Sequence, residues 1–259
     1  MGQSSSDEGD STQIYTTEGS PYTLYVPPAK KVNFVERKNP DISGCTTLVI
    51  ASRGGTVKGK AKGVSAYSYS KGAGSGLIGL NVDYDIHAIT TAEKQPSKIY
   101  VLNGKNQNDQ VTAVNAKKTI TAFLNNDQKV QTIYYSGHGD EDGDWCFPDG
   151  YVTFEWLYGR LSTYNSNTLC VVTDCCHSGT WVAKLAKKDR SVTKKCFMTA
   201  ACGSDNVAWD NELARYLYGD LEGNEDLRGK LAKNGCCLFF DNKTVTLKER
   251  TILVGLSWT

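Results

Sequence analysis

The sequence has almost no net charge and no long apolar run, and each absence argues against a class of function. Across 259 residues, 29 Lys and Arg side chains stand against 28 Asp and Glu side chains, a formal net charge of +1. A chain without a dominant charge is not expected to bind nucleic acid. No stretch reaches the length of a transmembrane helix, and the N-terminus lacks the pattern of a secretory signal. We therefore expect a cytoplasmic protein.

The nine cysteines lack the spacing of a disulfide framework. Their number is odd, they are scattered, and two pairs are adjacent, Cys175-Cys176 and Cys236-Cys237. This usage favours a reducing, intracellular setting with free thiols. Most of the cysteines are expected to be small buried hydrophobes, namely Cys45, Cys170, Cys175, Cys236 and Cys237.

Residues 1–43 have the composition of a disordered leader, rich in Ser, Gly, Asp and Pro. The prolines are expected to interrupt any regular element there. The start, Met1 to Ser6, matches the N-myristoylation pattern with Gly2 as the acceptor. An ordinary tail is the alternative, because the acidic residues that follow would repel anionic lipid. At most we expect weak membrane association through one lipid.

Short apolar runs alternate with helical patterns along the rest of the chain. The runs at 46–51, 98–102, 130–135 and 169–173 are typical of strands buried on both faces. Between them, one helix is indicated by Val82, Ile86 and Ile89, and another by Val114, Ile120, Phe123 and Leu124. Later strands are expected at 196–201 and 251–256. The pattern predicts an α/β sandwich around a mostly parallel sheet.

Two of the predicted strands run directly into reactive residues. The strand at 130–135 leads into Ser-Gly-His-Gly, which contains His138, and the strand at 169–173 leads into Asp-Cys-Cys-His-Ser-Gly, which contains Cys176. Loops at the carboxyl edge of a parallel sheet converge, so the two motifs should meet. A thiol needs a nearby base to become a nucleophile at neutral pH, and His138 can supply it. The N–H groups of Gly139 and Cys176 could form an oxyanion hole.

These two motifs, in this order at strand ends, resemble the catalytic pair of metacaspases within the wider caspase-like clan. The resemblance implies a caspase-like three-layer sandwich over 44–259, with a large-subunit region to about 183, a basic linker at 184–195 and a small-subunit region at 196–259. It implies His138 as base, Cys176 as nucleophile and Asp174 as a wall of the primary specificity pocket. Metacaspases cut after Arg or Lys. Where they usually carry two consecutive aspartates after the later cysteine, this chain has Ser204 and Asp205.

The resulting hypothesis is a cysteine endopeptidase that cuts proteins or peptides after Arg or Lys through an acyl-enzyme. The rival is an inactive caspase homologue that serves as a regulatory or binding scaffold. The basic linker is itself of the residue type that an acidic pocket would select, so self-cleavage is expected there. Its candidate sites are Lys187, Lys188, Arg190, Lys194 and Lys195.

Other residues offer competing interpretations. Cys175, Cys176, His177 and Cys202 could be imagined around zinc, but adjacent ligands give poor tetrahedral geometry. His177 could compete as the base, although it directly follows the nucleophile. Residues 74–79 spell GxGxxG, which here is more typical of a flexible loop. Asp83, Asp85 and His87 are most simply the solvated face of their helix.

The acidic loop 140–144 follows the proposed catalytic histidine at once. Its carboxylates are hard oxygen ligands, and many metacaspases depend on calcium, so calcium is a possible activator. A solvated loop is the default interpretation, and no cofactor is required for the proposed chemistry. Residues 145–153 contain a Pro-Asp-Gly turn and are expected to form a hairpin beside the site.

Overall fold

The computed structural model describes the greater part of the chain after residue 41 and two short strands before it. The described residues are 13–15, 21–23, 42–53, 80, 82–92, 98–104, 111–126, 128–161, 168–188, 196–209, 211–218, 224–240 and 243–246. The chain divides into two compact units, residues 1–36 and 37–259. In the first unit, strands β1 (Gln13–Tyr15) and β2 (Pro21–Thr23) pair antiparallel. The expectation of no regular element in the leader is therefore wrong at these two segments.

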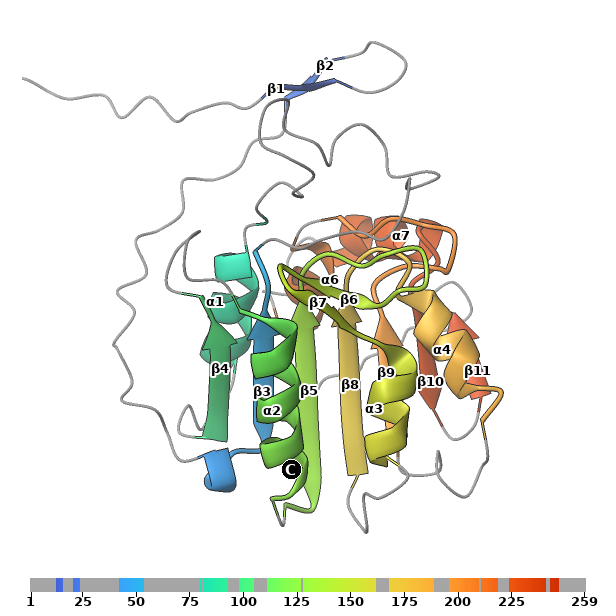
Figure 1. The fold of residues 1–259 in the computed structure, drawn as a ribbon. Coiled ribbons are helices and arrows are strands. Elements are labelled where there is room, and N and C mark those ends of the chain that lie inside the picture. The colour runs from blue at the N-terminus through green and yellow to red at the C-terminus, as the bar shows by residue number, and fades with distance from the viewer. Residues whose placement is uncertain are drawn as a thin grey trace, which may run out of the picture. The chain divides into compact units, whose positions relative to one another are not determined.

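A seven-stranded sheet forms the centre of the second unit, with the strand order β11-β10-β9-β8-β5-β3-β4 (Figure 1). Strands β4, β3, β5, β8 and β9 are mutually parallel, and β10 is antiparallel to both of its neighbours. The strands are β3 (Thr47–Ala51), β4 (Ile99–Asn103), β5 (Val130–Ser136), β8 (Thr168–Asp174), β9 (Cys196–Ala200), β10 (Cys237–Phe240) and β11 (Lys243–Thr246). The predicted mostly parallel sheet is confirmed.

Helices cover both faces of this sheet and make three layers (Figure 1). One face packs against α2 (Ala113–Leu124), α3 (Phe154–Leu161) and α4 (Gly179–Leu185). The other face packs against α1 (Val82–Ala92), α6 (Glu212–Tyr218) and α7 (Asn224–Lys233). A 3₁₀ turn at Ile42–Gly44 precedes β3. The α/β sandwich predicted from the alternation of strands and helices is thus confirmed.

Alternation along each central strand distributes its side chains between the two cores. In β3, Leu48 and Ile50 face the α2 side, whereas Val49 and Ala51 face the α1 side. A strand that is buried on both faces has to be apolar at nearly every position. This is why the central strands could be recognised as continuous apolar runs.

Helix α2 begins at a cap that links it to the hairpin near the site. The Thr112 hydroxyl accepts a hydrogen bond from the Asn115 N–H at 3.1 Å. The Asp149 carboxylate accepts from the Ala113 N–H at 2.5 Å and from the Val114 N–H at 3.3 Å. Asp149 lies between the hairpin strands β6 (Trp145–Phe147) and β7 (Gly150–Val152), which confirms the predicted hairpin.

One prediction about the elements needs correction, one pair of strands was missed, and one prediction lies outside the described residues. Val114 is 68% exposed and does not belong to the buried face of α2. The antiparallel pair β10 and β11 was not predicted. The strand expected at 251–256 lies outside the described residues.

None of the nine cysteines, all of which the structure describes, forms a disulfide bond, as the irregular spacing predicted. Cys176 is partly exposed and the other eight are buried. Within the described residues, no helix combines the length and apolar character that crossing a lipid bilayer requires.

Candidate active site

The strand register brings the two reactive motifs to the same edge of the sheet. Ser136, the last residue of β5, pairs with Asp174, the last residue of β8. The Gly137 N–H donates to the Asp174 carbonyl at 3.2 Å and extends this pairing one residue further. His138 and Cys176 each follow within two residues. The chain places β4 on one side of β3 and then returns to place β5 on the other side. The candidate site lies at the end of β5, beside this reversal of strand order. Ligand sites in parallel α/β sheets commonly lie at such reversals.

The backbone of His138 is held from below by an aromatic stack. Its carbonyl accepts hydrogen bonds from the Tyr135 hydroxyl at 2.8 Å and from the Cys146 N–H at 3.0 Å. The Tyr135 ring stacks on Trp145 at 4.6 Å between centroids, and Trp145 stacks on Trp181 of α4 at 4.7 Å. These rings are fully buried, so the turn that bears His138 packs on a rigid aromatic support.

Gly139 lies directly against the backbone of Cys176. A Cβ atom at Gly139 would come within 2.2 Å of the Cys176 carbonyl oxygen and 2.9 Å of the Cys175 Sγ. Only glycine permits this approach. Neither the Gly139 N–H nor the Cys176 N–H donates to a backbone carbonyl of another described residue. The close contact therefore joins the two motifs and leaves two neighbouring amides for another acceptor.

The two adjacent cysteines have different surroundings. The Cys176 side chain is partly exposed, and its thiol donates a long contact of 3.9 Å to the Ala208 carbonyl. Burial raises the pKa of the Cys176 thiol to about 11, and the negative charge of Asp174 acts in the same direction. Cys175 is fully buried, and burial raises the pKa of its thiol well above the ordinary value. Both thiols are protonated at neutral pH in this structure, so Cys176 needs a base to react.

Buried acidic groups lie at the same edge, on the α1 side. Asp174 is 7% exposed, and its Oδ2 accepts from the Tyr134 hydroxyl at 2.7 Å. The Ser136 hydroxyl donates to Asp85 Oδ2 at 2.6 Å, and Asp85 is 1% exposed. Burial, followed by the charges of Asp174 and Asp85, raises the pKa of Tyr134 well above its usual range, so this hydroxyl remains a donor. The edge therefore carries two carboxylates.

Asp85 corrects the interpretation of its helix as a solvated face. His87 is exposed as predicted, and Asp83 pairs with Arg53. Asp85, however, points into the molecule toward Ser136. The signal was present in the sequence: Asp85 lies three residues from Val82 and four from Ile89, and these spacings place all three on one helix face.

A loop after β9 passes beside the turn that bears Cys176. Residues 201–209 include Asp205, whose side chain is exposed, and Ala208, whose carbonyl meets the Cys176 thiol. Trp209 follows at 52% exposure, which is unusual for so large an apolar side chain. The sequence analysis singled out Asp205 but missed Trp209.

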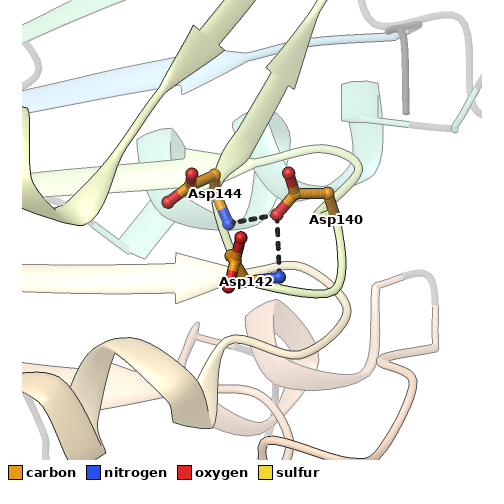
Figure 2. A group of neighbouring side chains, drawn as sticks. All are labelled: Asp140, Asp142 and Asp144. Atoms are coloured by element: carbon orange, nitrogen blue, oxygen red, sulfur yellow. Dashed lines mark hydrogen bonds between the residues drawn. The ribbon is translucent and has the colours of Figure 1, made fainter. Parts of the chain in front are cut away.

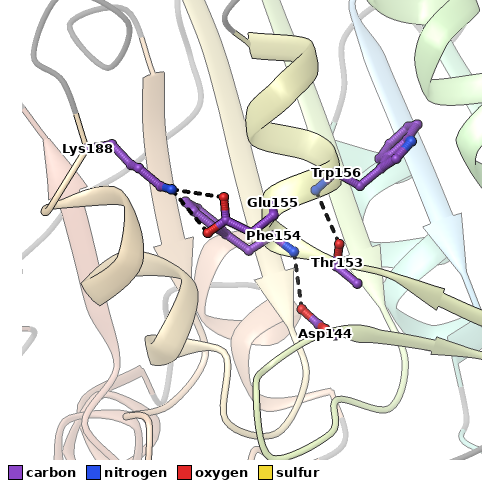
Figure 3. Close-up of polar contacts among 6 residues, drawn as sticks. All are labelled: Asp144, Thr153, Phe154, Glu155, Trp156 and Lys188. Carbon is purple, nitrogen blue, oxygen red and sulfur yellow. Dashed lines mark hydrogen bonds and ion pairs between the residues drawn. The ribbon is translucent and has the colours of Figure 1, made fainter.

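The acidic loop is built more tightly than a solvated loop. Asp140 and Asp144 are buried, and Asp142 is exposed. Asp140 Oδ1 accepts from the N–H groups of Asp142 at 3.0 Å and Asp144 at 2.9 Å (Figure 2). Asp144 Oδ1 accepts from the Phe154 N–H at the start of α3, at 3.1 Å (Figure 3). The default interpretation as a solvated loop is thus wrong for Asp140 and Asp144, whose carboxylates hold backbone amides.

In the described part of the chain, Asp140, Asp142 and Asp144 are the one group of potential ligands close enough together to hold a metal ion. One ligand atom from each lies within 4.8 Å of the others. Calcium takes six to eight oxygens, so three carboxylates would need further carbonyl or water ligands. Cys175, Cys176, His177 and Cys202 do not form such a group, although all four are described. The zinc alternative therefore has no support in the geometry.

The segment expected to be a basic linker begins inside a helix. Lys184 belongs to the last turn of α4, and the N–H groups of Lys187 and Lys188 donate to the carbonyls of Lys184 and Leu185 at the end of that helix. The Lys188 ammonium pairs with the Glu155 carboxylate at 2.9 Å (Figure 3) and lies over the Tyr158 ring at 4.6 Å. The first two residues of the predicted linker, 184 and 185, thus belong to α4, and 186–188 form the turn after it. Arg190, Lys194 and Lys195 lie outside the described residues, as do Gly2 and the GxGxxG segment at 74–79.

Comparison with known proteins identifies no family for this chain. No family model and no curated protein matches the sequence. Among solved structures, caspase-1 from Spodoptera frugiperda is similar, with 12% identity, a TM-score of 0.41, and coverage of 77% of this chain and 81% of that chain. A likeness at this identity and score carries no argument about function, so the residues themselves have to carry it.

Proposed function

We propose that this protein is a cysteine endopeptidase in which Cys176 is the nucleophile and His138 its base. The observation that carries the proposal is the contact between Gly139 and the Cys176 carbonyl, where a Cβ would approach to 2.2 Å. It joins the turn that bears the only partly exposed cysteine to the turn that bears a partly exposed histidine. The resemblance of both motifs to metacaspases supports the same pairing.

The proposed reaction proceeds through an acyl-enzyme. His138 accepts the thiol proton while the Cys176 sulfur bonds to the scissile carbonyl carbon, and the carbonyl electron pair moves to oxygen. The Gly139 and Cys176 N–H groups stabilise that oxyanion. As the C–N bond breaks, His138 returns the proton to the leaving amine. His138 then takes a proton from water, the resulting hydroxide attacks the thioester, and the C–S bond breaks as sulfur regains the proton.

The raised pKa of Cys176 gives a pH-dependent prediction. In a His138→Ala variant, the thiol alone ionises near pH 11, so its alkylation by iodoacetamide should rise about tenfold per pH unit up to that range. In the wild type, proton transfer to His138 should allow alkylation already near pH 7. Mass spectrometry of the Cys176 peptide measures both rates. Identical pH profiles for the two proteins would contradict a role for His138 as base.

The proposed substrates carry Arg or Lys before the cleaved bond. Two buried carboxylates lie near the turns that bear Cys176 and His138, on the α1 side of the sheet. Asp174 precedes Cys176 by two residues, and Asp85 accepts a hydrogen bond from Ser136, which precedes His138 by two residues. A cationic side chain beside buried carboxylates gains charge-assisted hydrogen bonds that a neutral side chain does not. Asp205, exposed on the neighbouring loop, supplies a third carboxylate nearer to solvent.

Asp174→Asn tests this preference with little change of shape, because the amide oxygen can still accept from Tyr134. We expect kcat/KM to fall about 10- to 100-fold for Arg and Lys peptides, the worth of a charged hydrogen bond, and to change little for neutral peptides. Glu141→Gln removes one exposed charge from the acidic loop and is the matched control. An equal loss for basic and neutral peptides would assign Asp174 a structural role instead.

Self-cleavage between β8 and β9 is a further expectation of the proposed specificity. The sites are Lys187, Lys188, Arg190, Lys194 and Lys195, but a cut at either of the first two requires the turn after α4 to open. Because β9 pairs with β8 along five residues, the two fragments should remain associated. Intact mass spectrometry should show two fragments for the wild type and a whole chain for Cys176→Ala. Equal cleavage of both proteins would point to another protease.

Two remaining proposals concern the leader and the rival function. Myristoylation at Gly2 would give a single lipid and therefore only reversible membrane binding.

The scaffold alternative predicts a folded protein that binds partners but hydrolyses no peptide. It is disfavoured because a scaffold does not need glycine at 139 or a partly exposed thiol at 176.

A further inference from the structure

His177 has an unusual backbone at an important place. It directly follows the proposed nucleophile and has a φ of 57°, in the left-handed region. A non-glycine residue seldom adopts this conformation, and doing so costs roughly 1 kcal/mol or more. The side chain is buried, at 8% exposure. Something in the surroundings has to offset this conformational cost.

Two hydrogen bonds from His177 reach the loop after β9. Its backbone N–H donates to the Asn206 carbonyl at 2.9 Å, and its ring Nδ1 donates to the Ser204 carbonyl at 2.8 Å. These two acceptors flank Asp205 on either side. A third contact runs the opposite way, from the Cys202 N–H to the Ser178 hydroxyl at 3.3 Å. These three hydrogen bonds join the Cys176 turn to the loop, and longer contacts of the Cys202 and Cys176 thiols with the Cys175 and Ala208 carbonyls add to them.

The ring is not arranged as a second base. Because Nδ1 faces a carbonyl oxygen, it carries a hydrogen. The Nε2 atom is buried and has no hydrogen-bond partner among the described residues, so it makes no hydrogen bond with the Cys176 thiol. The interpretation of His177 as a competing base therefore finds no geometric support. The contact that the side chain does make is with the loop.

We infer that His177 is a positioning residue that fixes Asp205 relative to the Cys176 thiol. The same loop continues to Ala208, whose carbonyl lies 3.9 Å from that thiol, so a shift of the loop moves the exposed carboxylate with respect to the reacting sulfur. The inference rests on the proposed function, because it assigns Asp205 to the binding of a basic side chain. It makes His177 a determinant of substrate affinity and not of the chemical step.

Two substitutions separate the side-chain contact from the backbone conformation. Asparagine tolerates the left-handed region, and its amide nitrogen occupies a place close to that of Nδ1. Glycine accepts the same backbone with no cost but has no donor. We expect His177→Asn to behave like the wild type. We expect His177→Gly to raise KM for Arg and Lys peptides about three- to tenfold, with kcat within about twofold.

A double variant tests whether the effect acts through Asp205. In an Asp205→Ala background, His177→Gly should raise KM by less than about twofold, because the carboxylate that it positions is gone. A full additional rise would overturn the inference. So would a fall in kcat at unchanged KM, or a His177→Asn variant as impaired as His177→Gly.

Hydrogen exchange gives a readout that is independent of turnover. Three amides of the loop, those of Cys202, Gly203 and Asn206, donate hydrogen bonds. Peptides covering 201–209 should therefore show protection from exchange. Exchange should be faster in His177→Gly and unchanged in His177→Asn. Unchanged exchange in His177→Gly would overturn the inference. If the wild type cleaves no basic peptide, the proposed function fails, and exchange still decides whether His177 holds the loop.

Discussion

Cys176→Ala should abolish peptide hydrolysis, with a loss on the order of 10⁴-fold or more in kcat. Of the nine cysteines, all of which the structure describes, the substitution removes the one that is partly exposed, beside two amides that donate to no backbone carbonyl of another described residue. Alanine fits where cysteine did, so the fold should be retained. Steady-state hydrolysis of a fluorogenic Arg peptide measures the loss, and circular dichroism checks the fold.

The neighbouring thiol is the matched control. Cys175 is fully buried, and its Sγ packs near Gly139 and the Gly143 carbonyl. Cys175→Ala should cost about 1 kcal/mol of stability and leave kcat within a few-fold of the wild type. If Cys175→Ala were inactive and Cys176→Ala active, the assignment of the nucleophile would be wrong by one residue.

His138→Ala should be nearly as damaging as loss of the nucleophile. Without a base, burial keeps the Cys176 thiol protonated, since its pKa is raised to about 11. A nucleophile and its base act as a unit, so the double variant His138→Ala with Cys176→Ala should be no slower than Cys176→Ala alone. The same fluorogenic assay on all three proteins tests both statements.

Substitution of another histidine, His87, is the control for His138→Ala. His87 is exposed on α1, and His87→Ala should leave kcat unchanged. His138→Ala should retain its fold by circular dichroism, because Tyr135 and Cys146 hold the His138 carbonyl, which the substitution leaves in place. A His138→Ala variant with full activity would remove the histidine from the mechanism.

The central fold could be predicted because its strands are buried on both faces. Burial on both faces favours apolar, aromatic or β-branched residues at most positions of β3, β5 and β8, and such runs stand out in the sequence. Strand β10 contains a comparable run, Cys-Leu-Phe-Phe, but it is only four residues long. Short runs of this kind do not separate strand from helix by periodicity. Its pairing with β9 depends on a partner far back in the chain, whereas β11 follows it directly.

The candidate site was predictable in its first residues and not in its supports. His138 and Cys176 were found because each follows a strand within a distinctive motif. The burial of Asp140 and Asp144 could not be read from a loop that is acidic throughout, because it depends on which amides the turn presents to each carboxylate. The two carbonyl contacts of His177 likewise depend on the path of a loop that lies 27 residues further along.

The most direct measurement is hydrolysis by the wild-type protein of fluorogenic peptides that differ only in the residue before the cleaved bond. With Arg, Lys, Leu and Asp at that position, we expect Arg and Lys peptides to be cleaved with kcat/KM at least about tenfold above the others. Cleavage should disappear in Cys176→Ala. Preference for the Asp peptide would contradict the proposed acidic pocket around Asp174, and absence of cleavage for every peptide would contradict the proposal that this protein is a peptidase.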